Sequence, residues 1–239
     1  MVNPTPMAIV NRSTVLTDAA ITAVMPAIQK QISSQLASAW NVDAVLSFVG
    51  LGGPTPAAGN WALTITDNTD DPAGDLGYHS SDANGPYAKV FAKTSLDAQQ
   101  EWSSVLSHEL LEMLVNPLGC LAAFIPWDDS GVRGTYYDLE VCDPVYPKDQ
   151  CYLIDNVLVS DFVFPAWFAP WITRPEAGRT TPKVDQADRV QAALQLAPGA
   201  VVSISGKASL NGPPPSASTA AFVRTPSTLM ARHRAGSKA

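Results

Sequence analysis

The chain has 239 residues, of which 46% are hydrophobic and only 15% are charged, so it has ample apolar material for a buried core. It contains no run of about 18 apolar residues, which argues against a membrane-spanning helix. The N-terminus has no basic segment followed by an apolar one, so we expect no secretory signal peptide.

The net charge of −7 is distributed unevenly. From Arg179 onward, eight basic residues stand against two acidic ones, so residues 179–239 carry +6 and residues 1–178 carry −13. We therefore expect one domain over residues 1–178 and a basic, Pro/Ser/Ala-rich C-terminal extension over residues 179–239. Such a tail is suited to acidic surface, its own or a neighbour's, or to nucleic acid; a merely soluble tail is the alternative.

Three cysteines are present: Cys120, Cys142 and Cys151. An odd count without a C-x-x-C pair predicts reduced thiols in the core and not a disulfide framework. A Cys142–Cys151 bridge remains an alternative.

The first predicted strand covers residues 7–10. Thr17 and Asp18 then open an amphipathic helix, within which Pro26 predicts a kink or a late start. Its apolar residues recur at helical spacing: Ile21, Val24, Ile28, Ile32 and Leu36. Three further strands are predicted over residues 42–49, 61–66 and 87–93.

One helix is predicted over residues 97–116, with Ser95 or Asp97 as its N-cap and an end at Asn116-Pro117. The strands expected after it cover residues 121–125, 136–141, 151–154 and 157–164. The Asp128–Gly131 segment is expected to be a turn, and Asp155-Asn156 a two-residue hairpin turn. An apolar loop over residues 162–171, a short helix over 182–196 and a strand over 201–205 complete the prediction.

The helix over residues 97–116 carries a polar stripe. At about 100° per residue, His108 and Glu112 lie one turn apart and point the same way, with Glu109 beside them. This spacing suits two side chains that bind one cation. The opposite side is apolar and would pack into the core: Trp102, Leu106, Leu110 and Met113.

A plain amphipathic helix with its polar side in water is the alternative. However, Val105, Leu111 and Val115 lie within about 60° of the stripe. A solvated face is rarely bordered by apolar residues on both sides, and a half-buried polar stripe needs a partner because unpaired buried charge is costly. The pattern therefore favours a site.

The segment His108-Glu109-Leu110-Leu111-Glu112 resembles the H-E-x-x-H helix of zincin metallopeptidases, with the second histidine replaced by glutamate. The order of elements also resembles a zincin: an N-terminal helix, several strands, a strand beside the cleft (residues 87–93) and then the active-site helix. Longer segments resemble a group of bacterial and phage-borne proteins: residues 106–114, 140–144, 160–163 and 165–168. That similarity covers about residues 75–170 and by itself implies no activity.

The resemblance implies an α+β, zincin-like fold with a mixed twisted sheet, an N-terminal helix, an active-site helix and an extended C-terminal tail. It makes His108 and Glu112 metal ligands and Glu109 the general base for a metal-bound water. A third ligand must come from elsewhere, with Glu140 the first candidate and Asp143 the second. The alternative for both is an acidic strand end before a turn.

The departure from H-E-x-x-H makes the donor set harder and more anionic than that of most catalytic zinc sites. Zinc is the expected metal, with manganese or calcium less disfavoured than usual. His79 is a second catalytic candidate, because it could complete a two-histidine ligand set or hydrogen-bond a tetrahedral intermediate. A purely structural role for His79 is the alternative.

The function this implies is a metal-dependent peptidase that acts on a peptide or protein substrate. The alternative is a non-enzymatic structural or assembly protein, such as a phage virion component, that forms homo-oligomers or assemblies through its tail. A membrane partner is not expected, and nucleic acid is not favoured because aromatic and basic residues are not interleaved. The expected location is the cytoplasm or a virion.

Overall fold

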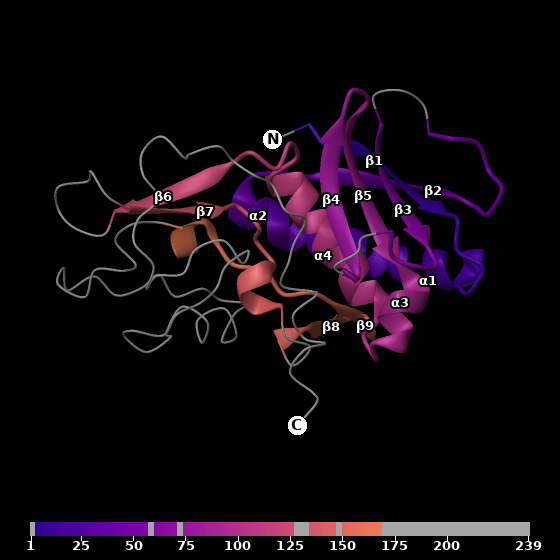
Figure 1. Cartoon of the computed structure of the whole chain (residues 1–239). Helices are drawn as coiled ribbons and strands as arrows, with labels where there is room; N and C mark the ends of the chain where they lie inside the picture. The colour runs from indigo at the N-terminus through magenta and orange to yellow at the C-terminus, as the bar shows by residue number, and fades with distance from the viewer. Residues whose placement is uncertain (1–2, 57–59, 71–73, 127–133, 147–149, 169–239) are drawn as a thin grey trace.

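The computed structural model describes residues 3–56, 60–70, 74–126, 134–146 and 150–168. Its central sheet has five strands in the order β2-β1-β3-β5-β4 (Figure 1). The first four strands of that order are parallel, and β4 pairs antiparallel with β5 at one edge. The strands are β1 (Thr5–Asn11), β2 (Ala44–Val49), β3 (Trp61–Thr66), β4 (Gly77–Asp82) and β5 (Gly85–Phe91). The mixed sheet is therefore confirmed, but the fold class is α/β and not the expected α+β, because four of the five strands are parallel.

The predicted N-terminal helix connects β1 to β2. It begins as α1 (Asp18–Lys30), where the Thr17 hydroxyl accepts a hydrogen bond of 3.1 Å from the Ala20 N–H. It continues as a π-helical segment, η1 (Gln31–Leu36), and ends as α2 (Ala37–Trp40). Pro26 lies inside α1, so the late start considered for this helix is wrong.

The single helix predicted over residues 97–116 is wrong at its beginning. Two helices are present: α3 (Ala92–Asp97) and α4 (Trp102–Val115). Between them Gln99 has a φ of 59°, a left-handed conformation that ends a helix. Ser95 and Asp97 therefore lie in α3 and do not cap α4, which starts after Glu101. The predicted end at Asn116 is confirmed.

The strand β4 was not predicted, and the strand expected over residues 87–93 lies two residues earlier, as β5. Two small hairpins follow: β6 (Ala122–Pro126) with β7 (Gly134–Asp138), and β8 (Tyr152–Ile154) with β9 (Val157–Val159). The β8–β9 turn is confirmed, since Asp155 and Asn156 both have positive φ, as a type I′ turn requires. Both β7 and β9 end earlier than predicted.

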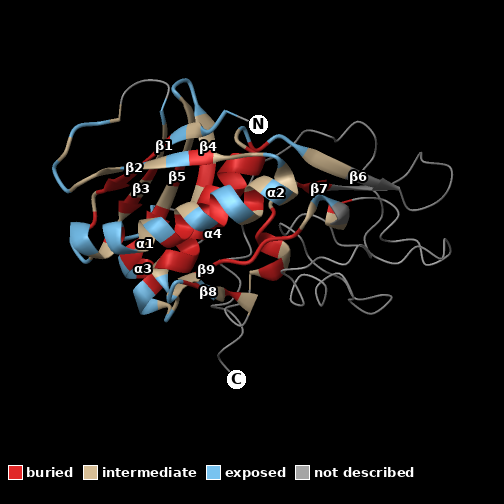
Figure 2. Ribbon diagram, turned by 180° about the vertical axis from the view of Figure 1, so that it is seen from behind, coloured by how far each residue is buried: buried red, intermediate tan, exposed pale blue. Residues whose placement is uncertain are grey.

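Helix α4 lies between the sheet and the C-terminal segments, and every residue from Ser103 to Val115 is buried (Figure 2). Leu106, Leu110 and Met113 have no exposed surface, as predicted for the apolar side. The Ser103 hydroxyl donates to the Leu158 carbonyl, and the Ser107 hydroxyl accepts from the Ser160 N–H at 2.7 Å. These contacts place β9 against the face of α4 that carries Ser103 and Ser107. In a surface helix that polar face would be exposed to water, but here it is covered.

None of the described cysteines forms a disulfide, so the prediction of reduced thiols is confirmed and the Cys142–Cys151 bridge is wrong. Cys142 and Cys151 are buried as predicted, but Cys120 is exposed and does not lie in the core. Among the described residues no helix is both long and apolar enough to cross a bilayer. The predicted turn at residues 128–131, the end of the apolar loop at 169–171, the helix over 182–196, the strand over 201–205 and the boundary at 178/179 lie outside the described residues.

Asp67 follows β3 and holds the loop after β1. Its carboxylate accepts hydrogen bonds from the Ser13 hydroxyl, the Thr14 hydroxyl and N–H, and the Val15 N–H. Burial alone would raise the pKa of Asp67, but these hydrogen bonds outweigh it and lower the pKa to about 2.

We expect Asp67 to contribute stability that is fully present above about pH 4 and is lost as the pH falls through about 2, because the folded-state pKa lies below the unfolded one. The measurement is urea unfolding of the wild type and of Asp67→Asn between pH 5 and pH 2. The difference between the two proteins should shrink as the pH falls. A difference that stays constant over this range would contradict the assignment.

Candidate metal centre

The polar stripe of α4 is buried. His108 is 1% exposed, and Glu109 and Glu112 are not exposed at all. The alternative of a solvated helix face is therefore wrong for these three residues. Glu101, which lies just before α4, is exposed.

Two other segments bring polar side chains to this stripe. Strand β4 packs along α4, and its alternating burial turns Gly77 and His79 inward. The segment after β7 supplies Glu140 and Asp143, the latter at the start of a short 3-10 helix, η2 (Asp143–Val145). All six residues that the sequence singled out thus lie in one cluster: His79, His108, Glu109, Glu112, Glu140 and Asp143.

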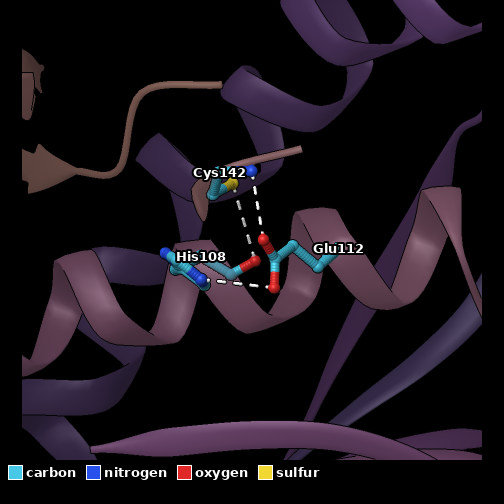
Figure 3. A group of neighbouring side chains, drawn as sticks. All are labelled: His108, Glu112 and Cys142. Atoms are coloured by element: carbon cyan, nitrogen blue, oxygen red, sulfur yellow. Dashed lines mark hydrogen bonds and ion pairs between the residues drawn. The ribbon is translucent and has the colours of Figure 1, made fainter. Parts of the chain in front are cut away.

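One part of the cluster surrounds the His108 ring. The His108 Nε2 atom lies 3.2 Å from Glu112 Oε2 and 3.4 Å from Asp143 Oδ1. Cys142 lies on the same side, with its Sγ 3.8 Å from the carbonyl oxygen of His108 (Figure 3). The thiol therefore contacts the backbone of His108.

The other part of the cluster surrounds His79. The His79 Nε2 atom lies 3.4 Å from Glu140 Oε2. The other ring nitrogen, Nδ1, lies 3.7 Å from Glu109 Oε2 and 3.8 Å from Glu112 Oε2. The imidazole of His79 thus lies close to three carboxylates, two from α4 and that of Glu140.

Glu112 is held in place by backbone donors. Its Oε1 accepts a hydrogen bond of 3.1 Å from the N–H group of Cys142 (Figure 3). It accepts a second one, of 3.2 Å, from the N–H group of Asp143. These bonds fix the carboxylate and leave Oε2 to face the two histidines. Glu112 Oε2 is therefore the atom common to both parts of the cluster.

Many polar atoms of the cluster make no hydrogen bond and approach one another only as imidazole–carboxylate pairs. Within the described residues, these buried atoms make no hydrogen bond: His79 Nε2, both nitrogens of His108, both oxygens of Glu109 and Asp143, and the Oε2 atoms of Glu112 and Glu140. Buried polar atoms without a hydrogen bond are rare and costly in folded proteins. Such a set could bind a metal ion.

Within the described residues, no lysine or arginine supplies positive charge to the cluster. Of the four such side chains there, Lys30, Lys89 and Lys93 pair with Asp155, Asp70 and Asp97. Arg12 binds backbone carbonyls of residues 11, 50 and 53. Three buried carboxylates and the half-buried one of Glu140 therefore face two imidazoles and no other described cation.

The pKa values reflect this imbalance. Burial alone would lower the pKa of His79, but the carboxylates of Glu140, Glu109 and Glu112 outweigh it and raise the pKa to about 9. Burial likewise opposes protonation of His108, but Glu112 and Asp143 raise its pKa well above the usual value. Burial raises the pKa of Glu109 and of Glu140. Without a metal, protons on the imidazoles supply the positive charge that the carboxylates require.

The residues present fit a divalent cation. Within the described residues, two groups of three side chains could each bind one cation, because one donor atom from each side chain lies within 4.8 Å of the other two. The groups are His108, Glu112 and Cys142, and His79, Glu112 and Glu140. The spacings of 3.2 and 3.4 Å around His108 Nε2 match the roughly 3.3 Å between ligand atoms of a tetrahedral zinc ion with bonds of about 2.0–2.1 Å. Carboxylate oxygens and imidazole nitrogens are ligands that zinc and manganese accept.

The two candidate third ligands occupy different places. Glu140, the first candidate from the sequence, lies against His79, and Asp143, the second, lies against His108. Cys142 joins the His108 group although the sequence did not single it out as a ligand; its position between Glu140 and Asp143 was the available signal. Burial raises the pKa of the Cys142 thiol well above its usual value, which makes it the weaker donor in this group.

Because Gly77 has no side chain, the side chain of Glu109 can pack closely against its backbone. A Cβ atom at residue 77 would lie 2.8 Å from Glu109 Oε1 and 2.9 Å from both Glu109 Cγ and the carbonyl oxygen of Lys89. We expect Gly77→Ala to lower the free energy of unfolding by about 1–3 kcal/mol, as overpacking does. Urea unfolding measures this change. Ser81→Ala in the same strand is the control and should change it by less than about 0.5 kcal/mol; equal effects of the two would contradict the close packing.

Comparison of the chain with protein-family models, with curated proteins and with solved structures finds no match.

Proposed function

We propose that the chain is a metal-dependent peptidase of the zincin type, with residues 1–178 as the metal-binding domain. The observation that carries the proposal is the position of Glu109 next to three buried donor atoms that make no hydrogen bond in the described structure: His108 Nε2, Glu112 Oε2 and Asp143 Oδ1. Hydrolysis by a metal-activated water requires at least a bound cation and a general base beside it.

In this proposal His108 Nε2, Glu112 Oε2 and Asp143 Oδ1 hold a divalent cation, most simply zinc. When bound, such a cation supplies Lewis acidity and lowers the pKa of water to near neutrality. The backbone N–H groups of Cys142 and Asp143 keep Glu112 oriented for this task.

Glu109 is the general base. Burial raises the pKa of its carboxyl, and a base whose pKa lies closer to neutrality transfers protons more effectively at pH 7. His79 lies 3.7 Å from Glu109 and is assigned to hydrogen-bond the oxygen on which negative charge develops. The substrate class is a peptide or protein, by resemblance to the zincins.

The test is metal content together with hydrolysis. Purified full-length protein is analysed for zinc and manganese, then assayed on a fluorescently labelled unfolded protein before and after chelation. The proposal expects at least one bound metal per chain, hydrolysis that chelation abolishes, and recovery when the metal is restored. A chain that binds neither metal at micromolar concentration would overturn it.

A second candidate, a non-enzymatic assembly protein with a structural metal centre, is favoured by the burial of the cluster. Structural metal sites are closed, whereas catalytic ones keep an open position. Glu109 is fully buried, and the cavity that adjoins His108 is smaller than the roughly 300–1,000 Å³ of typical ligand pockets. This candidate expects bound metal without hydrolysis, and unfolding when the metal is removed.

A further inference from the structure

The cluster contains two candidate cation groups. His108 belongs to one, and His79 and Glu140 belong to the other; Glu112 is the one residue that both contain. The proposed function uses only the His108 group for the metal. It leaves the Oε2 atom of Glu140, which is buried and makes no hydrogen bond in the described structure, without a role.

The carboxylate of Glu112 is arranged to serve both groups with one atom. Its Oε1 is occupied by two backbone N–H groups, and its Oε2 lies 3.2 Å from His108 Nε2 and 3.8 Å from His79 Nδ1. With metal–oxygen bonds of about 2.0–2.2 Å, two cations sharing this atom lie at most about 4.4 Å apart. Hydrolytic two-metal sites have a spacing of about 3.5–4 Å.

The negative charge of the carboxylates in the cluster also favours more than one divalent cation. Bound cations favour the ionised form of neighbouring carboxyl groups, and Glu109, Glu112, Glu140 and Asp143 can together carry four negative charges. One divalent cation leaves two of these charges uncompensated in a buried site, which is unfavourable. A second divalent cation neutralises them.

We propose that the centre is binuclear, with one divalent cation on His108 and Asp143, a second on His79 and Glu140, and Glu112 Oε2 shared between them. The inference rests on the proposed function for the first cation. It adds the second cation and makes His79 a ligand of that cation, in place of the hydrogen-bonding role that His79 has with a single metal. The oxygen-rich second group suits Mn²⁺ or Zn²⁺. In a hydrolase, a pair of cations stabilises both the attacking and the leaving oxygen.

The first test is a count of bound metal with a probe of metal–metal distance. Metal-free full-length protein is dialysed to equilibrium against Mn²⁺, and bound manganese is measured by mass spectrometry. The electron paramagnetic resonance spectrum of the loaded protein is then recorded. The proposal expects two Mn²⁺ per chain and the spectrum of a spin-coupled pair. Two uncoupled Mn²⁺ ions would overturn the shared second site. A single bound Mn²⁺ would also overturn the second site but would leave the proposed function standing. A chain that binds neither Mn²⁺ nor Zn²⁺ would overturn both proposals.

The second test assigns the ions to residues. Glu140→Gln should remove the cation on His79, so that the number of bound Mn²⁺ ions falls from two to one and the spin coupling is lost. Asp143→Asn should remove the cation on His108, with the same result. Glu101→Gln, an exposed carboxylate just before α4, is the matched control and should retain two coupled ions. Circular dichroism of the metal-free variants verifies folding. A coupled pair that persists in Glu140→Gln would overturn the assignment.

Discussion

Replacement of Glu112 by alanine is expected to abolish metal binding and hydrolysis together. Glu112 Oε2 lies 3.2 Å from His108 Nε2 and is the donor shared by both candidate groups, so its loss leaves neither group complete. Residues that only hydrogen-bond to a metal ligand contribute about 10–100-fold to metal affinity, so the loss of the ligand itself should lower affinity by more than about 100-fold.

The same substitution should also remove the stabilisation that metal gives to the folded chain. At a metal concentration 100 times the Kd, the wild type gains about 2.7 kcal/mol. For a chain of this size that corresponds to a Tm increase of about 5–11 °C. Differential scanning calorimetry with and without Zn²⁺ measures this increase, which should vanish in Glu112→Ala.

A milder variant separates metal loss from structural damage. In Glu112→Ala the N–H groups of Cys142 and Asp143 lose their acceptor, which costs about 1–3 kcal/mol for each buried donor. Glu112→Gln keeps a carbonyl oxygen for these donors but lacks the charge. We expect its metal-free Tm to stay near that of the metal-free wild type, while metal still fails to raise it. Metal binding by Glu112→Gln at wild-type affinity would contradict the ligand role.

The parts of the fold that were predicted correctly carry a local pattern. Thr17 caps α1, apolar residues repeat along α1 and α4, and Asp155-Asn156 forms a tight turn, and each of these depends on neighbours in sequence. The strand β4 carries no such pattern, because its sequence Gly-Tyr-His-Ser-Ser-Asp lacks apolar alternation. It forms through pairing with β5, where His79 lies opposite Ala88.

The break between α3 and α4 was missed for a similar reason. No glycine or proline marks it; Gln99 adopts a positive φ in the chain connection between two packed helices. This conformation depends on tertiary packing, and propensity alone gives no signal for it.

The candidate site was predictable to the extent that it lies on one helix. The spacing of His108, Glu109 and Glu112 fixes their common face, and the apolar residues beside them indicated burial. The order of preference between Glu140 and Asp143 depended on the path of the chain after β7. The 3-10 turn that starts at Asp143 brings this side chain to His108, whereas Glu140 meets His79. Spacing along the sequence contains no information on that choice.

Replacement of Glu109 by glutamine is expected to lower kcat by about 10²–10⁴-fold while metal remains bound. Glutamine has nearly the same shape, so it fits the space beside Gly77, but it cannot accept a proton at neutral pH. Glu109 belongs to neither candidate metal group, so the count of bound metal should not change. Steady-state kinetics on the labelled protein substrate, with metal content measured on the same sample, separates the two effects.

The fold of this variant should be at least as stable as that of the wild type without metal, because burial disfavours the charged form of Glu109. A loss of activity therefore reports on chemistry and not on unfolding. If Glu109→Gln loses its metal, Glu109 is a ligand and the general base must be another residue. If it keeps both metal and full activity, Glu109 has no part in proton transfer, and the buried carboxylate has a structural role beside His79.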